Sequence, residues 1–256
     1  MENIELTNAL RKKIYALGSA KQRNVERAFV AEGTRCVLEI IGHLPCRYLA
    51  ATAEWFNQWG ARLADVDKLI VVPQSEIARL SQQKSPQPVL AVFSMPVWRD
   101  RQPQPTRGLY LALDCVQDPG NLGTIIRLAD WYGITDLFCS RDTVDVFNPK
   151  VVQATMGALV RVGVHYVDFA DFLRNSSLPV YGTFLDGENI YNGDLAGDAI
   201  IVMGNEGNGI SSQVAQTVTR RIFIPPFPAN RSTVESLNVG VAAAITVAEF
   251  RRRQIQ

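Results

Sequence analysis

Asn121-Leu-Gly-Thr-Ile-Ile-Arg127, Gly204-Asn-Glu-Gly-Asn-Gly209 and Glu235-Ser-Leu-Asn-Val239 are the three polar motifs that decide the fold expected for this chain of 256 residues. Each motif follows a short apolar run of the kind that forms a buried β-strand. Polar and glycine residues at the carboxyl ends of strands are typical of ligand sites in α/β proteins. We therefore expect the three motifs to converge on one pocket, although they lie far apart in the sequence.

Short apolar runs alternate with helical patterns through the second part of the chain. The expected strands are residues 109–113, 136–139, 164–167, 180–185, 200–203 and 221–224. Alternation of strands and helices predicts a parallel sheet covered on both faces, which is an α/β fold. The last expected helix spans about residues 237–253, where Arg251, Arg252 and Arg253 suit the negative end of the helix dipole.

A proline-rich stretch over residues 94–107 predicts a semi-rigid linker. We therefore divide the chain into a first domain, residues 1–95, a linker, residues 96–107, and a second domain, residues 108–256. In the first domain, strands are expected at 28–31, 48–51, 69–72 and 89–93, and helices at 34–41, 53–58 and 75–80. This pattern predicts a small α/β domain.

The charge of the chain is uneven. Residues 1–107 carry 15 Lys and Arg against 10 Asp and Glu, whereas residues 108–256 carry 11 against 15, so the net charge of +1 combines parts of +5 and −4. A basic first domain suits the phosphate backbone of a nucleic acid, but a solvated charged surface explains +5 equally well.

Composition argues against several classes of protein. No apolar run approaches the roughly 20 residues needed to span a bilayer, and residues 1–5 lack the basic start and apolar core of a secretory signal. We therefore expect a cytoplasmic protein with no membrane role. Cys36, Cys46, Cys115 and Cys139 form no Cys-x-x-Cys pair, so we expect reduced thiols and no metal site.

The order and wording of the three motifs resemble the SpoU (TrmH) family of the SPOUT superfamily, and the resemblance covers most of residues 108–256. It implies 2′-O-methylation of a ribose in RNA, ribosomal RNA in preference to transfer RNA, with S-adenosylmethionine (AdoMet) as the cofactor. It also implies a carboxyl-terminal trefoil knot and a homodimer formed through the knotted domain. The first domain is similar to the RNA-binding domain, like ribosomal protein L30e, that precedes the catalytic domain in many members.

The resemblance assigns roles to residues of the motifs and of the strands near them. The implied catalytic residues are Asn121, Arg127, Glu206, Ser236 and Asn238. The implied cofactor-binding residues are Thr183, Leu185, Gly204, Asn205, Gly209, Ile224 and Leu237. The segment from Ile224 to Glu235 is four residues longer than is usual in the family and lacks its glycine. The cofactor loop at residues 226–234 is therefore expected to be reshaped.

Arg127 is the residue that the resemblance implies for activation of the 2′-hydroxyl. A guanidinium stays protonated and is not an ordinary base. We expect it to bind an RNA phosphate and orient the hydroxyl, while a phosphate oxygen or water takes the proton. A surface salt bridge from Arg127 to Asp130 is the structural alternative. His165 is the other conceivable base, but it lies in an apolar strand, where a packed imidazole is expected.

Cationic residues near the start of the chain are candidate RNA contacts. Lys12 and Lys13 face away from an apolar stripe that Leu10, Ile14 and Leu17 form at helical spacing. The other candidates, Lys21, Arg23 and Arg27, lie in or after an expected basic loop at residues 18–24. A solvated charged face is the alternative for each of them.

Two rival functions use the same features. A non-catalytic RNA-binding protein that retains the knotted fold is the first, but the polar residues of all three motifs argue against it. A nucleotide-binding hydrolase that uses the glycine loop is the second. Its loop lacks the Gly-Lys-Ser/Thr of a phosphate-binding Walker loop, and no cluster of metal-binding carboxylates is evident.

Overall fold

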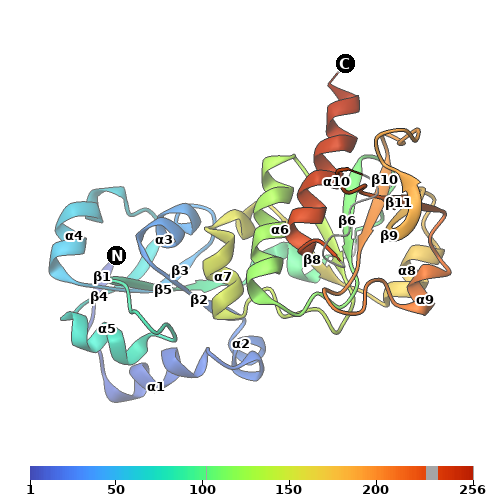
Figure 1. Ribbon diagram of the computed structural model, residues 1–256. Helices are drawn as coiled ribbons and strands as arrows, with labels where there is room; N and C mark the ends of the chain where they lie inside the picture. Colours follow the sequence, from blue (N-terminus) through green and yellow to red (C-terminus); the bar gives the residue numbers. More distant parts are fainter. Residues whose placement is uncertain (102, 229–235, 256) are drawn as a thin grey trace. The chain divides into compact units, whose positions relative to one another are not determined.

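The computed structural model of the protein describes residues 1–101, 103–228 and 236–255. The chain forms two compact units (Figure 1). The first contains Met1–Arg99 and Asp145–Val160, and the second contains Asp100–Val144 and Arg161–Gln256. Each unit has its own β-sheet and its own hydrophobic core.

A five-stranded mixed sheet forms the first unit, with the strand order β1-β4-β3-β5-β2. Its strands are β1 (Glu2–Asn3), β2 (Ala28–Glu32), β3 (Cys46–Ala51), β4 (Val66–Val71) and β5 (Val89–Ser94). β3 and β4 are parallel, whereas β5 runs antiparallel to both β2 and β3. The four longer strands confirm the apolar runs identified in the sequence, while β1 is too short to give a periodic signal.

Helices lie on both sides of this sheet (Figure 1). They are α1 (Asn8–Ala16), α2 (Ala20–Glu26), α3 (Thr34–Ile40), α4 (Ala53–Trp59), α5 (Gln74–Leu80) and α7 (Pro149–Thr155), with short 3-10 turns at Gly60–Arg62, Val97–Asp100 and Ala158–Val160. On one face, Ile14 and Leu17 at α1 share a core with Ile77 and Leu80 of α5. α3 and α7 pack against each other, and α7 also packs against β2. The first unit is therefore α/β, as the sequence predicts.

Two features of the first unit differ from the sequence expectation. The basic loop expected at residues 18–24 is mostly helix α2, because the Ser19 hydroxyl caps the helix by accepting a hydrogen bond from the Gln22 amide at 3.3 Å. The predicted division of the chain also does not anticipate that residues 145–160 pack within the first unit. Phe147 anchors this segment, since its ring centroid lies 5.1 Å from that of Phe29 and 5.7 Å from that of Trp98.

The second unit contains a six-stranded sheet with the order β11-β9-β10-β6-β7-β8, in which all neighbouring strands are parallel. Its strands are β6 (Leu109–Leu113), β7 (Asp136–Cys139), β8 (Gly163–Tyr166), β9 (Val180–Asn189), β10 (Ala199–Met203) and β11 (Arg220–Phe223). The parallel sheet predicted from the sequence is confirmed. β9 continues four residues beyond its expected end at 185, opposite a register shift in β11.

Both faces of the parallel sheet are covered by helices. These are α6 (Pro119–Trp131), α8 (Phe169–Arg174), α9 (Ser212–Ala215) and α10 (Val239–Gln254). Figure 1 shows α6 and α10 on one side of the sheet and α8 and α9 on the other. Ile200 and Val202 of β10 share a core with Phe169 and Leu173 of α8. Because Ile201 points to the opposite face, every residue of β10 is buried.

Arginines at the end of α10 do more than match the helix dipole. Arg253 donates hydrogen bonds to the backbone oxygens of Ile190 (2.9 Å) and Tyr191 (3.1 Å), so it ties the helix to the turn after β9. Glu249 accepts two bonds from Arg252, at 2.8 and 2.9 Å, and one from Arg253 at 2.8 Å. These bonds, those from Arg252 first, lower the pKa of Glu249 to about 2.

The expected trefoil knot stays a prediction, because the carboxyl-terminal segment that carries it includes residues 229–235, which lie outside the described residues. In the part of the chain that the structure describes, no helix is long and apolar enough to cross a membrane.

We expect Glu249→Gln to lower the melting temperature at pH 7 and to leave it unchanged near pH 2. The folded state lowers the pKa of this carboxyl from its ordinary 4.5 to about 2. Its contribution to stability is therefore fully present above about pH 4.5 and is lost as the pH falls toward 2. Melting curves of the two proteins across this range check the prediction.

Asp171→Asn is a suitable control, because Asp171 forms an exposed ion pair with Arg174 that should contribute little. A melting-temperature deficit of Glu249→Gln that persisted unchanged at pH 2 would contradict the assignment.

Candidate active site

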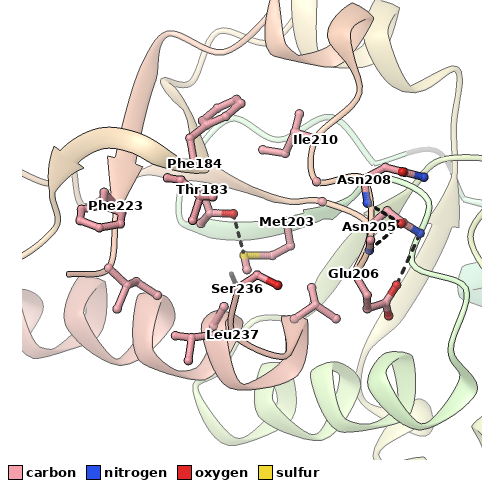
Figure 2. A pocket seen from close by; sticks show the side chains of 17 residues that line it. Thr183, Phe184, Met203, Asn205, Glu206, Asn208, Ile210, Phe223, Ser236 and Leu237 are labelled. Atoms are coloured by element: carbon pink, nitrogen blue, oxygen red, sulfur yellow. Dashed lines mark hydrogen bonds between the residues drawn. The ribbon is translucent and has the colours of Figure 1, made fainter. Parts of the chain in front are cut away.

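A cavity of about 460 Å³ lies at the carboxyl ends of β10 and β11, next to the middle of β9 and the start of α10 (Figure 2). Its lining comes from residues 183–185, 203–210 and 223–224 and from the segment 236–242. Parallel strands end at the same edge of a sheet, which is why segments so far apart in the sequence meet here. The volume is typical of a site for a small molecule or cofactor.

The glycine loop of the second motif forms one wall of the cavity. Asn205 and Gly209 exchange two backbone hydrogen bonds of 2.9 Å, and Asn205 Oδ1 accepts bonds from the amides of Gly207 and Asn208. Gly209 has a φ of +67°, which favours glycine. A Cβ atom at Gly204 would lie 2.2 Å from the carbonyl carbon of Gly209. A larger residue at position 204 would therefore displace the loop.

A chain of hydrogen bonds joins the three motifs. Asn238 Nδ2 donates to Asn121 Oδ1 at 2.9 Å, and Asn121 Nδ2 donates to Glu206 Oε1 at 2.7 Å. The groups at both ends determine which amide atoms donate and which accept in these hydrogen bonds. Asn238 Oδ1 caps α10 by accepting from the Gly240 amide at 3.0 Å, and a carboxylate at Glu206 can only accept. The predicted convergence of the motifs therefore rests on direct contacts.

Seven residues were expected to bind the cofactor, and all of them line the cavity: Thr183, Leu185, Gly204, Asn205, Gly209, Ile224 and Leu237. Glu206 and Ser236, expected to be catalytic, line it as well. Figure 2 shows Thr183, Met203, Ser236 and Leu237 grouped around the same space. The sequence reasoning missed apolar lining residues that follow or precede the motifs, namely Phe184, Met203, Ile210, Phe223, Val239 and Ala242. Their adjacency to strand ends is the signal that could have identified them.

The lining suits AdoMet. Leu185 and Leu237 are 71% and 45% exposed, although both are large apolar side chains on the cavity wall. A bound purine ring would cover such surface and remove it from water. The backbone around Gly204 and Gly209 carries no side chain that would keep a ligand away, and the Glu206 carboxylate supplies the negative charge that attracts a sulfonium.

Arg127 is exposed on α6 and is not part of the cavity lining. The alternative of a salt bridge to Asp130 is wrong. Asp130 instead accepts three hydrogen bonds of 2.8 to 3.1 Å from Arg161. Within the described residues, no hydrogen bond or ion pair involves the Arg127 guanidinium, which leaves it able to bind a ligand.

His165 does not belong to the site. It lies in β8, at the edge of the sheet farthest from β9 and β11, and is 4% exposed. Its Nε2 lies 2.8 Å from Asp136 Oδ1, and this hydrogen bond is the main cause of a lowered pKa of Asp136. The expectation of a packed imidazole is confirmed.

The candidate RNA contacts differ in their surroundings. Lys12, Lys21 and Arg27 are exposed, and Lys13 is paired with Glu26 at 3.0 Å. Arg23 is only 3% exposed. Its guanidinium donates to the backbone oxygens of Leu17 and Gly18 and pairs with Asp145 at 2.5 Å. Because the guanidinium is buried and both of its terminal nitrogens bond to internal acceptors, we leave Arg23 out of the RNA-binding set.

The cysteines are free thiols, and three of them are buried. Burial raises the pKa of Cys36 and of Cys46 to about 12. Among the residues that the structure describes, no group of three or more His, Cys, Asp and Glu could hold a metal ion.

Comparisons with known proteins agree with the motifs. A sequence model of the SpoU rRNA Methylase family matches residues 108–248, and a model of the MRM3-like substrate binding domain matches residues 8–91. The 23S rRNA (guanosine(2553)-2'-O)-methyltransferase RlmP of Bacillus subtilis is 30% identical over 185 residues, which are 71% of each chain.

Solved structures agree over nearly the whole chain. A TrmH-family protein from Porphyromonas gingivalis is 41% identical, with a TM-score of 0.84, and the match covers 97% of this chain and 99% of that one. An AdoMet-bound rRNA methyltransferase from Sinorhizobium meliloti is 29% identical, also with a TM-score of 0.84, over 99% of both chains. The resemblance of the three motifs is confirmed, and this chain belongs to the SpoU rRNA methylase family.

Proposed function

We propose that this protein transfers a methyl group from AdoMet to the 2′-hydroxyl of a ribose in ribosomal RNA. The main support for this proposal is the series of hydrogen bonds from Asn238 to Asn121 and from Asn121 to Glu206, next to a cavity that suits AdoMet. The name of the Bacillus subtilis relative, a 23S rRNA 2'-O-methyltransferase, supports the same reaction on the same class of RNA.

AdoMet supplies an electrophilic methyl group, so the task of the protein is mainly to position the ribose hydroxyl in line with it. In this proposal the cavity holds the cofactor, and Ser236 and Asn238 lie where the third motif meets its edge. Glu206 and Asn121 hold Asn238 in place. Their hydrogen bonds leave little freedom to the groups that face the reacting atoms.

Arg127 is proposed to orient the RNA. Its guanidinium is exposed and has no partner among the described residues, so two of its N–H groups can bind a phosphate while others face the hydroxyl. The proton of the hydroxyl then passes to a phosphate oxygen or to water, because a guanidinium does not act as an ordinary base.

The first unit is proposed to bind the RNA substrate through exposed cations. Lys12 and Lys21 are the best placed of the candidates, since both are exposed and neither forms an ion pair within the described residues. The match of residues 8–91 to a substrate binding domain supports this role. The reaction would take place in the cytoplasm.

We also propose a homodimer formed through the second unit. Trp131 of α6 is 84% exposed and Val241 of α10 is 49% exposed, and these two helices pack against each other. Large apolar side chains exposed on neighbouring helices are typical of an interface. A monomer mass by light scattering would refute this proposal.

The lining and hydrogen bonds of the site argue against the alternative of a non-catalytic RNA-binding protein. A protein that only bound RNA would need neither an apolar cavity beside the glycine loop nor a carboxylate hydrogen-bonded to two asparagines, Asn121 and Asn205. The hydrolase is disfavoured because the loop carries no lysine for a phosphate.

We expect the purified protein to bind AdoMet without RNA and Gly204→Ala to weaken that binding about tenfold or more, a change of about 1.4 kcal/mol or more. The added Cβ would lie 2.2 Å from backbone and would displace the loop. Gly197→Ala is the matched control, because its Cβ would meet only the end of the Gln254 side chain, at 3.7 Å. Calorimetry measures both. Equal affinity in the two variants would show that the loop does not shape the cofactor site.

Arg127→Ala and Arg127→Lys should both nearly abolish methyl transfer while the affinity for AdoMet and the melting temperature stay close to those of the unaltered protein. Lysine keeps the charge but loses the planar fork that can hold two groups at once. Transfer of labelled methyl to ribosomal RNA measures the effect. Near-normal turnover of Arg127→Lys would show that charge alone suffices, and loss of cofactor binding would show a structural role.

Lys12→Glu with Lys21→Glu should weaken RNA binding and flatten its salt dependence by about 0.7 to 0.9 in log–log slope for each phosphate that the variant no longer binds. Charge reversal is preferable to removal of the first domain, which would uncover Phe147 and the rest of 145–160. Filter binding at several salt concentrations is the measurement. Arg174→Glu on α8 is the control, and an equal loss in that variant would indicate non-specific attraction.

A further inference from the structure

A residue directly after β6 binds the backbone of the segment that follows the glycine loop. Asp114 follows β6 directly and is 6% exposed. Its Oδ2 accepts a hydrogen bond from the Ser211 amide at 2.7 Å, and its own amide donates to the Met203 oxygen at 2.9 Å. Ser211 follows Gly209 and Ile210, which line the cavity, whereas Asp114 does not line it. A buried carboxylate behind the wall therefore anchors one end of the loop.

The neighbouring residue, Cys115, anchors the other end. Its backbone oxygen accepts a hydrogen bond from Asn205 Nδ2 at 2.8 Å. Cys115 has a φ of +58°, a conformation that is uncommon outside glycine. The Ser140 hydroxyl accepts from its amide at 2.8 Å and helps to maintain that conformation. Because Asn205 directly precedes Glu206, both the wall of the cavity and the Glu206 carboxylate depend on this pair of residues.

We infer that Asp114 is a positioning residue for cofactor binding, acting through Ser211 on the glycine loop. This inference rests on the proposed function, since it concerns the same AdoMet site. Removal of the carboxylate leaves the Ser211 amide without its acceptor, and Gly209 and Ile210 then lose the bond that holds their backbone in place. The loop keeps its internal bonds but no longer presents its wall to the cavity in one position.

Four variants separate this role from a general effect on stability. Asp114→Ala removes the acceptor, and Asp114→Asn keeps an oxygen that can accept the same bond. Ser211→Pro removes the donor, and the φ of −62° at Ser211 suits proline. Ser211→Ala keeps the donor, and the Ser211 hydroxyl makes no capping bond that would be lost. Asp136→Ala is the matched control, because it breaks a carboxylate bond to His165 at the far edge of the sheet.

AdoMet affinity by calorimetry and the melting temperature are the readouts. We expect Asp114→Ala and Ser211→Pro each to raise the Kd about tenfold or more, the scale of one hydrogen bond to a charged group. The double variant should be no worse than either single one, because both remove the same bond. Asp114→Asn, Ser211→Ala and Asp136→Ala should stay within about threefold of the unaltered protein, well under one factor of ten.

Two results would overturn the inference: an unchanged Kd in both Asp114→Ala and Ser211→Pro, or an equal rise in Asp136→Ala. If Asp114→Ala does not fold, Ser211→Pro against Ser211→Ala decides the question. Absence of AdoMet binding by the unaltered protein would overturn the proposed function itself, and the inference with it.

Discussion

The carboxamide of Asn121 is the link on which the site depends. It accepts a hydrogen bond from Asn238 and donates one to Glu206, so one side chain on α6 connects the start of α10 with the glycine loop. An amide can do this because it carries a donor and an acceptor on one planar group. Loss of the bond to Glu206, which is partly buried, would leave a polar group without its partner, which costs more than the bond contributes.

The parallel sheet makes that link possible. Neighbouring strands of the sheet are parallel, so β6, β10 and β11 end at one edge and the segments that follow them are brought together there. The cavity wall also requires that two backbone segments of the glycine loop lie close together. The backbone of Gly209 runs so near Gly204 that no side chain fits between them, and the loop can form the cavity wall only with glycine at position 204.

Two arginines that the sequence analysis singled out have different surroundings in the structure. Within the described residues Arg127 has no partner, and Arg161 binds Asp130 through three hydrogen bonds, whereas Arg23 is buried and bonded to two backbone oxygens and Asp145. An exposed cation is available for a phosphate, whereas a buried, paired cation is not, and removal of its partner would destabilise the fold. Charge and position in the sequence do not distinguish the two cases, because Asp145, which pairs with Arg23, and Arg161, which binds Asp130, lie far along the chain from these arginines.

The sequence by itself indicated the longer strands and the parallel class of the second sheet through local periodicity, and the resemblance of its three motifs implied the seven cofactor-binding residues that line the cavity. Only the tertiary structure decided which side chains meet. Phe147 carries residues 145–160 into the first unit. Asp114 reaches Ser211 across 97 positions. Such contacts depend on pairs of residues that are distant in the sequence, and the periodicity of one strand or helix does not indicate which distant residue its side chains will contact.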